Sequence, residues 1–122
     1  MAKLAPRRRI ALRSVGALVV LGFLAFALHA VTGVGDETLF GTWIYCAVMV
    51  GAAVSCLGRA VLVRRERSAW LLIGAGLLIW TGGEIYYEAA LAISGSIPIP
   101  SPADAGYLLF YPFTYAGLIV LL

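Results

Sequence analysis

The chain has 122 residues, of which 62% are hydrophobic and 12% are charged, whereas a soluble domain is about 45–50% apolar and about 25% charged. This composition argues against a water-soluble protein, and no polar stretch is long enough for a soluble catalytic domain, which usually needs about 100 residues. The net charge is +3, but the basic residues lie in two clusters beside apolar segments. Such clusters are typical of membrane topology, and we predict no nucleic-acid partner.

Four apolar segments are long enough to cross a bilayer, whose hydrocarbon core of about 30 Å takes roughly 20 helical residues. We therefore predict an all-α polytopic membrane protein. Its four transmembrane helices are expected at about 14–34, 39–57, 69–93 and 103–122. Residues 1–13 then form a basic N-terminal segment, and residues 14–122 form a membrane domain that we expect to be truncated.

The first apolar segment has an alternative interpretation. Its basic start, its apolar run and the small-residue motif Ala25-Phe26-Ala27 are also compatible with a cleaved signal peptide. The apolar run continues beyond this motif through Ala30 and Val31. Its length suits an uncleaved span better than a signal peptide.

The positive charges are distributed unevenly. All nine Lys and Arg residues precede the first span or lie between the second and the third: Lys3, Arg7, Arg8, Arg9, Arg13, Arg59, Arg64, Arg65 and Arg67. Positively charged residues are retained on the cytoplasmic side during insertion. We therefore predict a cytoplasmic N-terminus, with extracytoplasmic loops around Asp36 and Glu37 and over residues 94–102.

The loop before the fourth span contains three prolines and ends in a helix-start signal. Ser101 suits the N-cap position, Pro102 the first helical position, and Asp104 the third, where its carboxylate can bond back to the cap. We interpret Ser101 and Asp104 as helix-capping residues.

Polar side chains within the spans are the candidate functional residues, because ionisable groups at membrane depth are costly. His29 lies in the first span. Acidic and aromatic residues recur every four positions on the third and fourth spans: Trp80, Glu84 and Glu88, and Tyr107, Tyr111 and Tyr115. This spacing places each group on one stripe of its helix.

The two stripes can face each other in an antiparallel hairpin that turns near Ile97 and Pro98. Such a hairpin pairs the side chains at three levels: Glu88 with Tyr107, Glu84 with Tyr111, and Trp80 with Tyr115. A phenol can donate a hydrogen bond to a carboxylate and partly offset its desolvation. We therefore predict this register.

Three interpretations of the polar residues stay open. They can form a satisfied packing cluster between helices. They can line an outward-opening pocket in which His29, Glu84 and Glu88, together with Tyr107 and Tyr111, sense protons or a small, unidentified ligand. His29, Glu84 and Glu88 can also bind a metal, although the sequence offers too few ligands at tight spacing to argue for it. We predict neither a metal nor a cofactor.

The run from Pro100 to Pro112, PSPADAGYLLFYP, is preceded by Trp80-x-x-Gly83-Glu84. Together they resemble the N-terminal membrane region of bacterial, particularly actinobacterial, multi-span signalling proteins. At the position after Gly83 that pattern has Asp as often as Glu, so Glu84 is a conservative departure that keeps the acidic group. In such proteins the membrane region commonly precedes cytoplasmic GGDEF and EAL domains, which make and degrade cyclic di-GMP, or a histidine kinase.

The resemblance implies an integral membrane anchor or sensory input segment in the bacterial plasma membrane. Its implied partners are the lipid bilayer and, through the membrane helices, a second copy of the chain. The 122 residues contain no GGDEF or EAL sequence, so we expect the chain to be non-catalytic, with the output domain in a missing continuation.

Two other functions are alternatives: a small stand-alone transporter and a membrane assembly protein without a ligand. The small multidrug resistance family also has four short spans and a membrane glutamate. That glutamate lies in the family's first span, whereas the first span here has no acid and Glu84 and Glu88 lie in the third.

Overall fold

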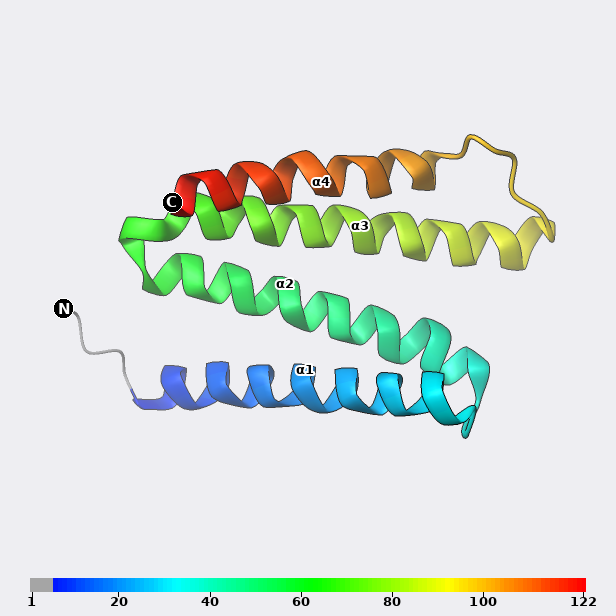
Figure 1. The fold of residues 1–122 in the computed structure, drawn as a ribbon, viewed down its shortest axis with the longest axis horizontal. Coiled ribbons are helices and arrows are strands. Elements are labelled where there is room, and N and C mark those ends of the chain that lie inside the picture. The colour runs from blue at the N-terminus through cyan, green and yellow to red at the C-terminus, as the bar shows by residue number, and fades with distance from the viewer. Residues whose placement is uncertain (1–5) are drawn as a thin grey trace.

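The computed structural model describes residues 6–122, and every regular element in this range is a helix. The elements are α1 (Pro6–Thr32), the π-helical turn η1 (Leu39–Ile44), α2 (Tyr45–Leu62), the 3-10 turn η2 (Arg64–Glu66), α3 (Arg67–Ser94) and α4 (Pro102–Leu121). The four long helices lie in chain order, and each packs mainly against the next, as Figure 1 shows.

The four spans expected from the sequence are present. Four helices are long and apolar enough to cross a membrane, with η1 extending α2 and η2 extending α3. The chain is therefore an all-α polytopic membrane protein, as predicted.

The first helix begins earlier than the expected span. It starts at Pro6 and already includes the arginines from Arg7 to Arg13, because proline suits the first turn of a helix and arginine is a good helix former. The described part of the basic segment thus continues α1. Lys3 and the rest of residues 1–5 lie outside the described residues.

Small side chains occupy the interior and large apolar ones cover the outside. Among residues 6–122 the fully buried apolar residues are alanines: Ala53, Ala60, Ala69 and Ala103. By contrast, Leu18 is 68% exposed and Leu108 is 69% exposed. Lipid solvates such a surface, whereas helices in lipid associate through small residues that let their backbones approach. The packing is therefore that of a membrane bundle.

Helices α3 and α4 make the most extensive contact of the fold, and glycines allow it. A Cβ atom added to Gly106 would lie 3.0 Å from the Ile79 carbonyl oxygen and 3.2 Å from the Gly83 Cα. Further along the same seam, a Cβ on Gly117 would lie 2.9 Å from the Ala69 carbonyl oxygen. At both positions a side chain would collide with the backbone of α3, so only glycine fits without a shift of the helices.

The predicted register of α3 and α4 is wrong by one helical turn. Glu84 lies level with Tyr107, to which it is hydrogen-bonded, and not with Tyr111. Helix α3 continues for about 15 Å beyond Glu84 to Ser94, whereas α4 begins only about 8 Å before Tyr107. The hairpin is therefore asymmetric, because α3 extends past the start of α4. Residues 95–101 run back along α3 to reach the start of α4 (Figure 1).

Substitution of Gly83 tests the close approach of α3 and α4. A Cβ on Gly83 would lie 3.1 Å from the Ala103 carbonyl oxygen, so we expect Gly83→Leu to lower the unfolding free energy by about 1–3 kcal/mol through overpacking. The adjacent Gly82 has no atom within 4 Å of such a Cβ, which makes Gly82→Leu the matched control. Denaturant titration in micelles measures both, and an equal loss in the two variants would contradict the packing.

Candidate functional site

Glu84 is the centre of the candidate site. The Tyr107 hydroxyl of α4 donates a hydrogen bond of 2.7 Å to Oε2 of Glu84 on α3, and both residues are partly buried. The glycine contact between Gly83 and Gly106 lies directly beside this pair and brings the two backbones close enough for the phenol to reach the carboxylate. A hydrogen bond to an ionised carboxylate is stronger than a neutral one, and it offsets part of the cost of burial.

Trp80 extends the site to the second helix. Its indole Nε1 donates a hydrogen bond of 2.9 Å to the hydroxyl of Tyr45 on α2. The indole ring also packs against Tyr107 and Phe110 of α4, at centroid distances of 4.9 and 5.2 Å. The residues joined in this way form the glutamate–aromatic cluster: Tyr45, Trp80, Glu84, Tyr107 and Phe110.

Helix α1 reaches the cluster through one aromatic contact. The ring of Phe26 lies 5.9 Å from that of Tyr45. Each of the four long helices therefore contributes a side chain to one contiguous polar and aromatic network. Helix α3 is its centre, since it provides both Trp80 and Glu84.

Two members of the cluster, Tyr45 and Phe110, were absent from the candidates drawn from the sequence. Tyr45 belongs to no stripe shared with Glu84, because it lies on a different helix. The one available signal was the indole N–H of Trp80, which needs an acceptor when it is buried. That requirement predicts an acceptor without saying which helix provides it.

The other predicted residues of the two stripes lie outside this hydrogen-bonded network. Glu88 is partly buried and Tyr111 is 49% exposed, and no side-chain hydrogen bond among residues 6–122 involves either one. Tyr111 instead packs edge-on against Phe110, with centroids 5.5 Å apart. Tyr115, which was predicted to lie level with Trp80, is 62% exposed, and the ring that packs against Trp80 is that of Tyr107.

His29 belongs to a different local structure. Its Nδ1 lies 2.9 Å from the Val34 carbonyl oxygen, and its ring stacks on Phe40 with centroids 4.4 Å apart. Next to it, Asp36 accepts a hydrogen bond of 2.8 Å from the Leu39 N–H. His29 therefore closes the corner between α1 and η1, and the described side chains of residues 6–122 include no group of three His, Cys, Asp or Glu placed to hold a metal.

A capping box fixes the start of α4 and so the position of Tyr107. The Ser101 N–H donates a hydrogen bond of 2.7 Å to Oδ2 of Asp104, and Pro102 occupies the first helical turn. The Asp104 carboxylate thereby satisfies a backbone donor that would otherwise be unpaired at the helix start. Tyr107 follows three residues later on the first turns of this anchored helix.

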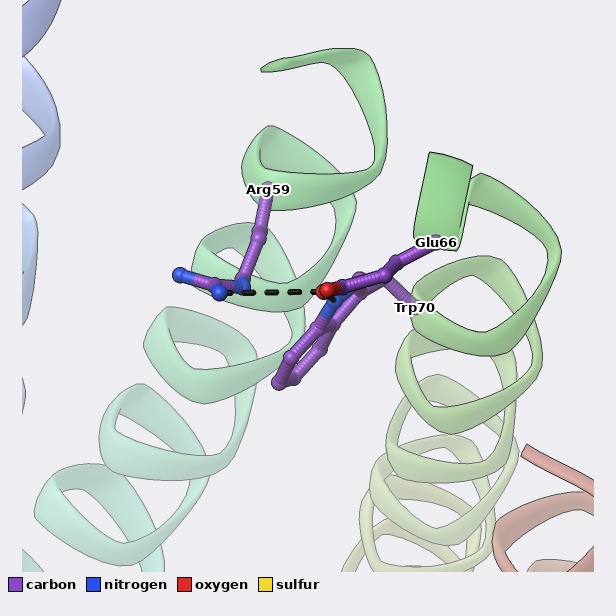
Figure 2. A network of polar contacts seen from close by, with 3 residues as sticks. All are labelled: Arg59, Glu66 and Trp70. Carbon is purple, nitrogen blue, oxygen red and sulfur yellow. Dashed lines mark hydrogen bonds and ion pairs between the residues drawn. The ribbon is translucent and has the colours of Figure 1, made fainter. Parts of the chain in front are cut away.

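A second polar network joins α2 and α3 at the opposite end of the bundle, and Figure 2 shows it. Glu66 accepts a hydrogen bond of 2.9 Å from the indole Nε1 of Trp70, and its Oε2 lies 3.7 Å from Nη2 of Arg59. The Arg59 guanidinium also lies 4.9 Å from the centroid of the Trp70 ring, a cation–π distance. Polar contacts thus tie α3 to α2 near its start, and to both α2 and α4 near its middle.

No protein-family model, curated protein or solved structure matches this chain. The function of the chain is therefore inferred from the geometry of the glutamate–aromatic cluster and from the chemistry of its residues.

Removal of the Tyr107 hydroxyl tests the geometry of the site. We expect Tyr107→Phe to lower the unfolding free energy in micelles by about 1–2 kcal/mol, because the Glu84 carboxylate loses its donor. Tyr111→Phe is the matched control, since the Tyr111 hydroxyl has no hydrogen-bond partner among residues 6–122, and it should leave stability within about 0.5 kcal/mol. A larger loss for Tyr111→Phe would instead favour the register that pairs Glu84 with Tyr111.

Proposed function

We propose that this chain is the membrane anchor and sensory input segment of a bacterial signalling protein of the cyclic di-GMP type. In this proposal it lies in the plasma membrane, is itself non-catalytic, and can pair with a second copy through its helices. The observation that carries the sensory role is the hydrogen bond between Glu84 and Tyr107, which joins α3 to α4 through an ionisable group within a span. Intramembrane ionisable residues commonly mark proton relays and ligand sites.

The proposed signal is a change in the protonation or contacts of Glu84. An ionised carboxylate accepts the Tyr107 hydrogen bond more strongly than the neutral acid does. Proton uptake, or a ligand that competes for Glu84, would therefore weaken the contact between α3 and α4. Helix α4 would carry this change towards an output domain of the kind found in the proteins that the sequence resembles.

The proposed topology has a cytoplasmic N-terminus. Its support is the position of the basic residues, which precede the first span or lie between the second and the third. The start of α1, the turn η2 and the end of α4 lie at one end of the bundle (Figure 1). Both described ends of the chain would then face the cytoplasm, together with the Arg59–Glu66–Trp70 network.

The gene sequence beyond the Leu122 codon tests the link to an output domain. We expect the open reading frame to continue into a cyclic di-GMP or kinase domain, as the resemblance implies. A stop codon at this position would contradict the proposed signalling role and favour a small stand-alone membrane protein.

A reporter fusion tests the sensory role. Residues 1–122 are fused to a diguanylate cyclase domain, and cellular cyclic di-GMP is measured at neutral and acidic external pH. Because glutamine resembles the neutral acid, we expect Glu84→Gln to give, at both pH values, the output that the unmodified fusion gives in acid. Glu88→Gln changes the same chemistry one turn away, at a side chain with no hydrogen bond among residues 6–122, and should respond to pH like the unmodified fusion.

Two results would contradict that expectation. One is an unmodified fusion whose output is independent of pH. The other is a Glu84→Gln fusion that still responds to pH as the unmodified fusion does.

A further inference from the structure

A groove between α1 and α2 lies at the end of the bundle opposite the glutamate–aromatic cluster. It has a volume of about 290 Å³. Residues of both helices line it, among them Leu12, Arg13, Gly16, Ser55, Arg59 and Leu62. The groove therefore combines apolar walls with two guanidinium groups.

The charge of this groove is only partly balanced. Arg59 forms an ion pair with Glu66, whereas none of the ion pairs among residues 6–122 involves Arg13. The two arginines and the single carboxylate leave one positive charge. A phosphodiester carries one negative charge, and its oxygens accept the N–H donors that arginine presents.

The arginine N–H groups, but not the serine hydroxyl, are the donors in the groove that can bind such a group. The 3.7 Å separation between Arg59 and Glu66 is longer than a hydrogen bond, so the Arg59 guanidinium keeps N–H donors for a ligand. The Ser55 hydroxyl, by contrast, already donates to the Gly51 carbonyl oxygen at 2.8 Å. Arg13 and Arg59 are therefore the side chains that can recognise an anion here.

The groove lies at the depth of lipid headgroups. The helix from Arg13 to Thr32 is about 29 Å long, close to the hydrocarbon thickness of about 30 Å. When Thr32 lies at one boundary of the hydrocarbon, Arg13 lies at the other. Leu12 and Leu62 can contact acyl chains at this level, and basic pockets between membrane helices are known to bind anionic headgroups.

We infer that this groove binds the phosphodiester headgroup of an anionic phospholipid between Arg13 and Arg59. The lipid would bridge α1 and α2, and its phosphate would supply the negative charge that Glu66 alone does not. The inference does not depend on the sensory role proposed for Glu84, which lies at the other end of the bundle.

Native mass spectrometry of the full chain in micelles tests this inference, with phosphatidylglycerol and phosphatidylcholine of identical acyl chains as probes. We expect a one-to-one complex with phosphatidylglycerol in preference to phosphatidylcholine. Arg13→Gln should reduce that preference about fivefold, the effect expected of one basic residue near an anionic lipid. Arg67→Gln removes the same charge from an exposed residue at the start of α3, outside the groove, and should leave the preference unchanged.

A second variant tests the groove without changing its charge. A Cβ added to Gly16 has no atom within 4 Å, so Gly16→Phe has space for its side chain, which should fill the groove and abolish the preference. Equal binding of the two lipids, equal effects of Arg13→Gln and Arg67→Gln, or unchanged binding by Gly16→Phe would each overturn the inference. Displacement of the lipid by excess inorganic phosphate would also overturn it, since it would show a site for free phosphate.

Discussion

A carboxylate within a membrane span needs a hydrogen-bond donor, and this requirement governs the arrangement of the bundle around Glu84. Tyr107 provides the donor from α4. Directly beside this pair, the contact between Gly83 and Gly106 brings the two backbones close together. The hydrogen bond and the close glycine contact therefore lie at the same level of the α3–α4 interface. The aromatic side chains of the cluster pack at this level too.

The arrangement makes α3 the central helix of the fold. Near its middle it contacts α2 and α4 through Trp80 and Glu84, and near its start it meets α2 through the Arg59–Glu66–Trp70 network. Helix α1 has no buried residue, and the groove with Arg13 lies on its seam with α2. The tightly packed half of the bundle thus carries the proposed sensor, and the loosely packed half carries the proposed lipid site.

The spans and the start of α4 could be predicted because their signals are local. Hydropathy over about 20 residues marks a span, and Ser101 and Asp104 form their capping contact within one turn. The register of α3 and α4 could not be predicted, because the length of residues 95–101 does not reveal that α3 extends past α4. The place of Tyr45 in the cluster depends on its contact with Trp80, 35 residues away on another helix. The position of His29 depends on the turn at Gly33 and Gly35, whose φ angles are +66° and +116°.

The most direct test of the central claim is a double-mutant cycle between Glu84→Gln and Tyr107→Phe, with unfolding free energies measured in micelles. The cycle isolates the coupling of the two side chains from the separate cost of each substitution. A direct hydrogen bond predicts a coupling energy of about 1 kcal/mol, as for other interhelical polar contacts in membranes. Additive losses, with a coupling energy close to zero, would contradict the claim that this bond holds α3 and α4 in register.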